Sequence, residues 1–308
     1  MTESVISVSD LVKVYGEVRA VDGISFEVRK GEVFSLVGPN GAGKTTAVEI
    51  LECLRKPTSG TASVLGFDVC TEEREIKRRI GVLPQDFNAF ERLTARENVE
   101  LVARIYGAKG RVEDILRSLD MWDVRKKKFM SLSGGMKQRT GICMALVSDP
   151  ELVFLDEPTT GLDPKARVET WEVIRNLKRM GKTVVLTTHY MEEVEHLCDR
   201  AAVIVRGRIA ALDSVGEMID RYGGGIKLKV RDAVAEVESS LKGRTPEVSE
   251  EHDGTLIGVF RNRMEASQAL VELYRADQEC RAEISEPTMD DVFLRLTGAR
   301  IDERGELL

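Results

Sequence analysis

The chain has 308 residues, of which 42% are hydrophobic and 31% are charged, and it carries a net charge of −7 at pH 7. This length favours one large and one small domain, and the acidic balance argues against a general nucleic-acid-binding protein. No run of 18 apolar residues occurs, so no membrane-spanning helix is expected. The first residues, Met1-Thr2-Glu3-Ser4, form no basic region and precede no long apolar stretch, which argues against a signal peptide. Five cysteines without a C-x-x-C pair indicate reduced thiols rather than disulfides or zinc ligands.

The N-terminal part of the chain predicts strands. Apolar and polar residues alternate over the first 30 residues, most clearly at Ile24, Phe26 and Val28, as in half-buried antiparallel strands. Tyr15 lies between two of these strands. The apolar run 32–37 then predicts a buried strand, and apolar residues at helical spacing over 47–54 predict a helix.

The loop between this strand and this helix fits the pattern G-x-x-x-x-G-K-[ST]. It consists of Gly38, Pro39, Asn40, Gly41, Ala42, Gly43, Lys44, Thr45 and Thr46. Its glycines let the backbone approach an anion, and the N–H groups at the helix start point toward that anion. Lys44 is expected to neutralise the β- and γ-phosphates, and the Thr45 hydroxyl to ligate Mg²⁺. The loop predicts a nucleoside triphosphate site, and by itself it leaves GTPases, kinases and many ATPases open.

Strands and helices then alternate, which implies a parallel sheet covered on both faces. The expected elements are a helical stretch 71–79, a strand 80–84 followed by Gln85, helical periodicity over 94–121, a helix capped by Ser133, strands 152–156 and 183–188 around a helix 164–180, a hairpin 202–210 and a helix from 214.

Two consecutive carboxylates end the predicted strand 152–156. Asp156 is placed to hold Mg²⁺, as a carboxylate at the end of a buried strand does in phosphate-loop proteins. Glu157 is a second carboxylate that could polarise a water molecule for in-line attack on the γ-phosphate. The alternative is that Glu157 only ends the strand.

The glycine run Gly223–Gly225 marks the predicted linker. We therefore expect a nucleotide-binding domain over 1–222, a linker over 223–225 and a small α+β domain over 226–308. The predicted order after the linker is strand 226–231, helix 232–242, strand 247–251, strand 255–260, helix 264–275 and strand 279–285, followed by an amphipathic helix 287–297. The βαββαβ order indicates a ferredoxin-like domain. His252 and Cys280 are isolated there and predict no site.

In their order along the chain, the motifs resemble those of the ATP-binding cassette (ABC) ATPases. They are the phosphate loop, Gln85, the segment Leu132-Ser133-Gly134-Gly135, the segment 152–158, the segment Gly161-Leu162-Asp163, and His189. The resemblance covers residues 4–220, and the Leu-Ser-Gly-Gly segment separates this family from other phosphate-loop proteins. It implies a phosphate-loop core with an antiparallel β subdomain and a helical subdomain, and it implies ATP and Mg²⁺ as ligands.

The resemblance also implies roles for single residues around one nucleotide. Tyr15 would stack on the adenine ring, and Gln85 would contact Mg²⁺ or the attacking water. His189 would contact the γ-phosphate and stabilise the transition state. Outside this context, a lone histidine after a strand is more often structural, and an aromatic between strands is often part of the core.

A second set of residues is implied to act on the nucleotide of another subunit. In a head-to-tail dimer of two copies, Ser133, Gly134 and Gly135 would touch the γ-phosphate held by the partner copy, and Asp163 would bridge the copies. A helix N-terminus with small residues is physically suited to bind an anion. Each copy is therefore expected to supply half of two shared sites.

The kind of ABC protein follows from what the chain lacks. The gap between Gln85 and Leu132 has no room for the long coiled coil of chromosome-maintenance members, and a single motif set differs from the tandem sets of translation-associated members. A transporter subunit remains, peripheral at the cytoplasmic side of the cell membrane and bound to a separate membrane-spanning permease. Residues 86–96 would dock a cytoplasmic helix of that permease.

Three segments resemble the multidrug-export branch typified by daunorubicin-resistance ATPases: 39–46, 132–136 and 286–294. This resemblance favours an exporter subunit over an importer subunit. A nucleotide-dependent regulatory protein not coupled to transport is the other alternative. The C-terminal domain is expected to regulate the ATPase or to stabilise its dimer, and the sequence does not identify a substrate.

Overall fold

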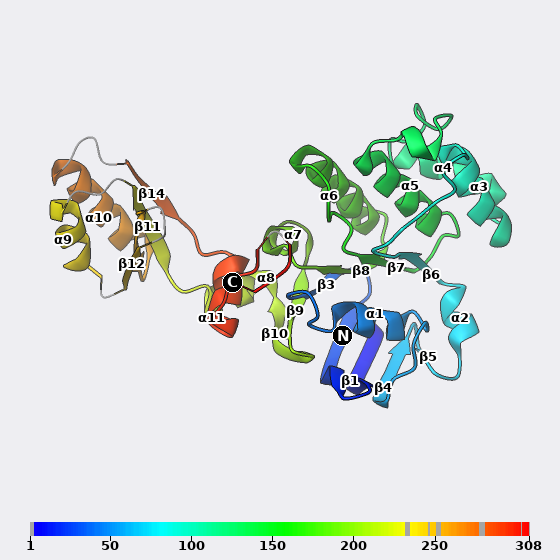
Figure 1. Cartoon of the computed structure of the whole chain (residues 1–308), viewed down its shortest axis with the longest axis horizontal. Coiled ribbons are helices and arrows are strands. Elements are labelled where there is room, and N and C mark those ends of the chain that lie inside the picture. Colours follow the sequence, from blue (N-terminus) through cyan, green and yellow to red (C-terminus); the bar gives the residue numbers. More distant parts are fainter. Residues whose placement is uncertain are drawn as a thin grey trace. The chain divides into compact units, whose positions relative to one another are not determined.

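The computed structural model describes residues 3–231, 235–245, 247–250, 254–276, 281–302 and 304–307. The chain forms two compact units (Figure 1), of which the first comprises 1–215 with 301–308 and the second 216–300. These bounds differ from the expected ones at both ends of the second unit. The segment 301–308 groups with the first unit because the backbone N–H of Asn40 donates to Gly305 O over 2.7 Å. The expected linker is packed within the second unit, since a Cβ on Gly225 would lie 2.1 Å from Phe260 O.

The first unit begins with an antiparallel sheet in the order β2-β1-β4-β5. Its strands are β1 (Ser4–Tyr15), β2 (Val18–Arg29), β4 (Ser59–Val64) and β5 (Phe67–Asp68). The predicted alternation is confirmed, because Ile24, Phe26 and Val28 are buried while the residues between them are exposed.

A second, six-stranded sheet has the order β10-β9-β3-β8-β7-β6. Its strands are β3 (Val33–Val37), β6 (Ile80–Leu83), β7 (Leu152–Asp156), β8 (Thr183–Thr188), β9 (Arg200–Val205) and β10 (Arg208–Ser214). Five strands run parallel and β10 joins β9 antiparallel, as a hairpin at the edge. Because β3, β8 and β7 are neighbours and parallel, the loops that follow them lie at one edge of the sheet.

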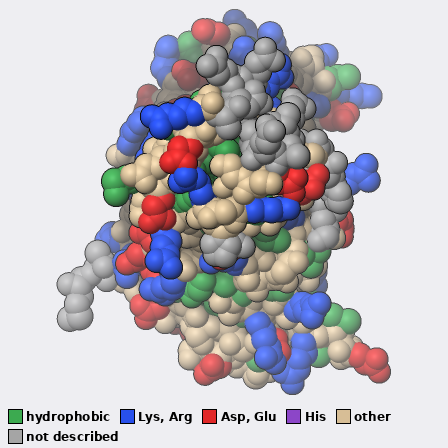
Figure 2. All heavy atoms as spheres, turned by 90° about the vertical axis from the view of Figure 1, so that its left-hand side faces the viewer, with side chains coloured by type: hydrophobic (Ala, Val, Ile, Leu, Met, Phe, Trp, Pro, Cys, Tyr) green, Lys and Arg blue, Asp and Glu red, His purple; other side chains and the backbone are tan. Residues whose placement is uncertain are grey.

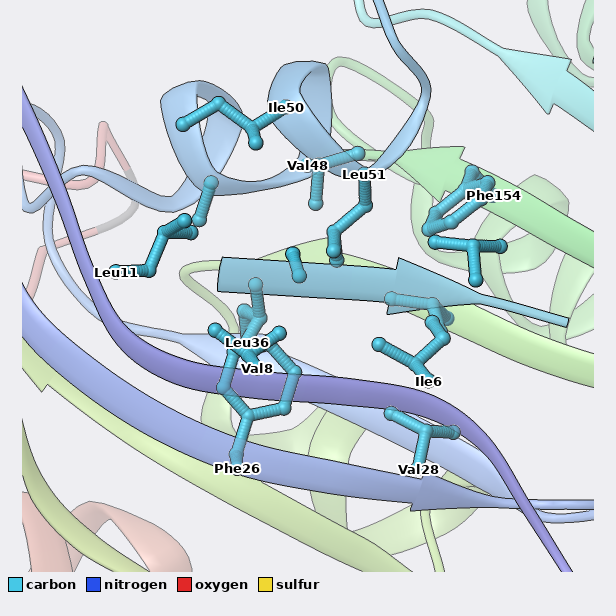
Figure 3. Close-up of a cluster of buried hydrophobic side chains, with 14 of the residues drawn as sticks. Ile6, Val8, Leu11, Phe26, Val28, Leu36, Val48, Ile50, Leu51 and Phe154 are labelled. Atoms are coloured by element: carbon cyan, nitrogen blue, oxygen red, sulfur yellow. The ribbon is translucent and has the colours of Figure 1, made fainter. Parts of the chain in front are cut away.

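Successive residues of the central strands face two different cores, which explains why these strands are apolar throughout. On one face, Phe34 and Leu36 pack with the first sheet and with α1 (Lys44–Leu51). Figure 3 shows Val48, Ile50 and Leu51 of α1 gathered with side chains of the first sheet and of β3. The start of α1 is thereby held rigidly beside the end of β3.

Helices cover the other face of the six-stranded sheet, around a core that includes Val33, Val153 and Val184. They are α3 (Ala95–Ile105), η1 (Lys109–Arg111), α4 (Val112–Ser118), η2 (Phe129–Ser131), α5 (Gly134–Leu146), α6 (Pro164–Arg179) and α7 (Met191–Leu197), while α2 (Glu73–Lys77) precedes β6 and α8 (Val215–Tyr222) follows β10. The helical periodicity over 94–121 is thus divided into two α-helices, with Gly107 at φ 70° between them.

The second unit has the βαββαβ order that the sequence predicted. It consists of β11 (Ile226–Arg231), α9 (Ala235–Lys242), β12 (Val248–Glu250), β13 (Leu256–Phe260), α10 (Arg263–Ala276), β14 (Arg281–Ser285) and α11 (Met289–Thr297). The sheet order β12-β13-β11-β14, antiparallel throughout, is the ferredoxin-like arrangement. Residues 232–234, 251 and 279, with His252 and Cys280, lie outside the described residues.

The surface of the second unit mixes both signs of charge. Figure 2 shows Lys and Arg side chains interspersed with Asp and Glu on the face that it presents. Ion pairs of this unit include Arg263 with Glu286 at 2.7 Å and Arg231 of β11 with Glu283 of β14 at 3.9 Å. The visible described side chains therefore form no broad field of one sign.

Candidate nucleotide-binding and hydrolysis site

The phosphate loop joins β3 to α1, as predicted. Gly43 stands immediately before α1 at φ 102°, and a Cβ there would lie 2.1 Å from Ala20 O, so only glycine fits. α1 has no side-chain cap and no acidic residue in its first turn. Its first N–H groups are thus left for an anion, which a helix N-terminus also attracts through its dipole.

Lys44 is buried at the start of α1. Its Nζ donates to Gly38 O over 2.8 Å and to Pro39 O over 3.2 Å, and lies 3.4 Å from Glu157 Oε1. Burial lowers the pKa of Lys44, while the negative charges of Glu157 and Asp156 act in the opposite direction. The ammonium is therefore held over the loop by oxygen atoms that phosphate oxygens could replace.

Asp156 ends β7 beside Thr45. Its Oδ1 accepts a hydrogen bond from the Thr187 hydroxyl and lies 3.5 Å from Thr45 Oγ1. Burial raises the pKa of Asp156, and the hydrogen bond from Thr187 lowers it. Two protein oxygens suit Mg²⁺, which is typically held by one or two side chains with phosphate oxygens and water. In the described ranges, no group of three or more His, Cys, Asp or Glu forms an all-protein metal site.

Glu157 has an unusual backbone, at φ 49°, a region that is costly for a residue other than glycine. The conformation is held by its N–H, which donates to Thr187 Oγ1 over 3.0 Å. Its Oε2 accepts from Thr160 Oγ1 over 2.9 Å and lies 2.8 Å from His189 Nδ1. Burial alone would raise the pKa of Glu157, but the His189 hydrogen bond and the Lys44 charge outweigh it and hold the pKa below its usual value. The carboxylate is therefore ionised at neutral pH and can accept a proton.

His189 follows β8 and is 5% exposed. Because an ionised carboxylate has no proton to give, His189 Nδ1 is the donor to Glu157 Oε2. Lys44, Thr45, Asp156, Glu157 and His189 are thus brought together at the edge where β3, β7 and β8 end.

Tyr15 and Gln85 lie at the margins of this cluster. Tyr15 is the last residue of β1 and is 40% exposed. It pairs with Val18 at the turn into β2, the strand in which Ala20 approaches Gly43, and the Lys13 ammonium lies 5.0 Å from the centre of its ring. Gln85 is exposed in the turn after β6, the neighbour of the strand that ends with Asp156.

The Leu-Ser-Gly-Gly segment forms a separate group with Asp163. Ser133 caps α5, and Asp163 caps α6 by accepting from Ala166 N over 3.0 Å. A Cβ on Gly135 would lie 3.0 Å from the Cβ of Ala166, so the two helix starts pack closely. Among the described residues, no hydrogen bond joins this group to the phosphate loop. The chain therefore carries two distinct clusters of predicted nucleotide contacts.

Several contacts around the site were not predicted. Thr160 and Thr187 hold Glu157, and the available signal was a polar residue within the apolar strand 183–188. The tail at 304–307 was also missed. Asn40 Nδ2 donates to Arg304 O over 2.7 Å, in addition to the backbone bond to Gly305, so the tail covers the outer side of the phosphate loop.

The phosphate loop follows β3, the acidic pair Asp156 and Glu157 stands at the end of β7, and the buried His189 follows β8, the strand between β3 and β7. Together these features define a phosphate-loop ATPase site. Residues 21–160 match the family described as ABC transporter. The chain is 38% identical over 312 residues to the daunorubicin/doxorubicin resistance ATP-binding protein DrrA of Streptomyces peucetius, covering 97% of this chain and 94% of that protein.

It is 37% identical over 319 residues to the Nod factor export ATP-binding protein I of Rhizobium etli, covering 98% and 96%. Among solved structures, it is similar to a dimeric post-hydrolysis state of the ATP-binding cassette MJ0796 bound to ADP and Pi, with TM-score 0.61, 29% identity and coverage of 68% and 98%. The chain belongs to the ABC transporter family, and it is an ATP-binding and ATP-hydrolysing protein.

Proposed function

We propose that this chain is the ATPase subunit of an exporter whose membrane-spanning part is a separate polypeptide. Its relatives are named for drug resistance and for Nod factor export, and the similarity extends over nearly the whole of both chains. In the part of the chain that is described, no helix is long and apolar enough to cross a membrane. A permease partner at the cytoplasmic face of the membrane fits both observations, with residues 86–96 as its docking segment.

The proposal that the chain hydrolyses ATP through Glu157 rests on one observation, which is that His189 and Lys44 keep the Glu157 carboxylate ionised. In the proposed reaction, Glu157 accepts the proton of the attacking water, and His189 orients Glu157 and contacts the γ-phosphate. Thr45 and Asp156, with Gln85, would hold Mg²⁺, which supplies positive charge to the phosphate oxygens. Lys44 and the N–H groups at the start of α1 bind the β- and γ-phosphates.

The two clusters of nucleotide contacts fit a head-to-tail dimer. Ser133, Gly134 and Gly135 of one copy would complete the phosphate site of the other, Asp163 would bridge the copies, and Tyr15 would stack on the adenine. ATP then joins two copies and hydrolysis separates them, which lets the permease alternate its access.

The variant Glu157→Gln tests this proposal. It should bind ATP with Mg²⁺, hydrolyse it about a hundredfold or more slowly, and accumulate as a dimer in size-exclusion chromatography with light scattering. Glu151→Gln is the matched control, because Glu151 is an exposed carboxylate paired with Arg79 at 3.8 Å. Normal turnover by Glu157→Gln would exclude Glu157 as the base.

Purification of the chain from its native membranes tests the transport coupling. An integral membrane protein that copurifies in equal amounts supports the exporter, while its absence favours a nucleotide-dependent regulatory protein. For the second unit, we propose a regulatory or dimer-stabilising role. Unchanged dimerisation, expression and transport after deletion of 224–308 would contradict both roles.

A further inference from the structure

Glu193 is a buried carboxylate that takes no part in the proposed reaction but contacts the segment that follows Glu157. Glu193, in the first turn of α7, is 0% exposed. Its Oε1 accepts from Thr159 Oγ1 over 3.0 Å and from Trp171 Nε1 over 3.3 Å. Its Oε2 is buried and, among the described residues, has no hydrogen-bond partner. A carboxyl group without contact to solvent is costly to keep, so its position calls for a physical explanation.

Two of the donors to Glu193, Thr159 and Trp171, belong to two other segments of the site. Thr159 follows Pro158 and precedes Thr160, whose hydroxyl donates to Glu157. Trp171 lies in α6, the helix that Asp163 caps. Glu193 itself lies four residues after His189, in the helix α7 that begins at Met191. The Glu193 carboxyl group therefore connects the segments that carry Glu157, Asp163 and His189.

We propose that Glu193 is a positioning residue for hydrolysis, which fixes the loop 157–163 relative to His189 and transmits the state of the Asp163 segment to Glu157. This inference rests on the roles proposed above for Glu157 and His189. Glu193 is fully buried, and we assign it no direct contact with the reacting groups. It acts through Thr159 and Trp171, because both lose the acceptor that they share when Glu193 is removed.

The pKa of Glu193 leaves a large share of its carboxyl groups protonated near neutral pH. Burial raises the pKa of Glu193 to about 7, against the opposing hydrogen bonds from Thr188, Thr159 and Trp171. A protonated carboxyl keeps Oε1 as the acceptor and adds no negative charge beside Glu157. Glutamine has the same shape and the same acceptor, so it should replace Glu193, whereas alanine should not.

The test compares Glu193→Ala and Glu193→Gln in the full chain, with ATPase rate and ADP affinity measured for each. Glu193→Ala should lower kcat about tenfold or more, because small misplacements of catalytic groups are costly. Its Kd for ADP should stay within about twofold, since the phosphate loop is untouched, and Glu193→Gln should keep most of the activity. Glu192→Gln is the control, because Glu192 is the neighbouring exposed carboxylate, with a side chain 60% exposed.

Combining variants distinguishes the proposed positioning role of Glu193 from a purely structural one. In a Glu157→Gln background, Glu193→Ala should cause little further loss of rate, because both act on the same step, while any loss of thermal stability should remain. If Glu193→Ala folds poorly, Trp171→Phe and Thr159→Val each remove one donor and should each lower kcat with ADP affinity retained. Wild-type kcat in these variants, an equal loss in the Glu157→Gln background, or a matching loss of ADP affinity would overturn the proposal. The outcomes of the single variants at Glu193, Trp171 and Thr159 do not depend on the effect of Glu157→Gln, so a failure of this inference is distinguishable from a failure of the proposed function.

Discussion

Lys44 Nζ and Glu157 Oε1 lie 3.4 Å apart, and both side chains are at most 5% exposed. The cation expected to bind the γ-phosphate thus also contacts the base expected to act on the water beside it. Removing either partner leaves the other charge buried and poorly compensated. Nucleotide binding and the protonation state of Glu157 are consequently linked through one ion pair.

Lys44→Ala should weaken ADP binding by roughly ten- to a hundredfold, the range for losing a charged hydrogen-bond donor. Because the Lys44 charge helps to lower the pKa of Glu157, the pKa should also rise. The acidic limb of any residual ATPase activity should therefore move to higher pH. Isothermal titration with ADP and a pH–rate profile measure the two effects. Lys44→Arg, which keeps the charge, should leave the acidic limb in place.

His189→Ala should slow hydrolysis and leave ADP affinity nearly unchanged. The hydrogen bond from His189 is the largest of the effects that lower the pKa of Glu157, so its loss should raise that pKa and move the acidic limb of the pH–rate profile to higher pH, while the slower hydrolysis follows from the loss of the contact that orients Glu157. His189→Gln can still donate and should retain more activity. Equal rates for the alanine and glutamine variants over pH 6–9 would argue that the hydrogen bond is not what matters.

Glu52→Gln should stabilise the protein in alkaline solution. Glu52 is 5% exposed, and burial raises its pKa from 4.5 to about 8, with smaller contributions from the charges of Asp156 and Glu49. The folded protein thus holds a proton on Glu52 that the unfolded chain releases. The contribution of this proton to the free energy of unfolding is complete below pH 4.5 and is lost as pH rises through about 8.

The gain from Glu52→Gln in the free energy of unfolding should therefore be on the order of 2–4 kcal/mol at pH 9 and near zero at pH 4.5. Urea unfolding at the two pH values measures it. Glu151→Gln serves as the exposed control and should change little at either pH. A gain independent of pH would mean that packing, rather than ionisation, is responsible.

Gly43→Ala should abolish nucleotide binding or folding, because its Cβ would collide with the backbone of β2 at 2.1 Å. Gly41→Ala is the matched comparison. Gly41 also has a positive φ, of 74°, but nothing lies within 4 Å of its Cβ position, so only backbone strain of about 1 kcal/mol is expected. Thermal unfolding with and without ADP distinguishes the two variants.

Removal of residues 301–308 should speed nucleotide binding, because the tail accepts hydrogen bonds from the backbone N–H and from the side-chain amide of Asn40. Gly305→Ala should act in the same direction. Gly305 has φ 82°, and a Cβ there would come within 2.8 Å of the Asn40 side chain. Stopped-flow measurements with a fluorescent ADP analogue give the association rate. An unchanged rate in both variants would show that the tail contact does not compete with nucleotide.

The parts of the site that follow from local pattern were predictable from the sequence. A glycine-rich loop between a buried strand and a helix needs only neighbours in sequence, and the two domains' element order followed in the same way. β4 was not predicted, because in its sequence Ser59–Val64 only Ala62 and Val64 are buried and the remainder is small and polar.

Contacts that depend on tertiary structure could not be predicted from the local sequence pattern. Glu193 lies in a helix with other acidic residues and looks like part of a solvated face. Its one distinguishing sign is its spacing of four residues from the buried Leu197, which places the two on one face of α7. The tail left no side-chain signature at all, because Asn40 is bound by the backbone carbonyls of Arg304 and Gly305.

The tail on Asn40 affects how the protein should be handled at the bench. A purification tag or fluorescent protein fused after residue 308 would be attached to the segment that contacts Asn40 of the phosphate loop. We expect such a fusion to alter the kinetics of nucleotide binding even in the unmutated protein. The start of β1 is the safer position. Tyr15 marks the end of β1 beside the loop, and Ser4 lies at the opposite end of the strand, roughly 35 Å away.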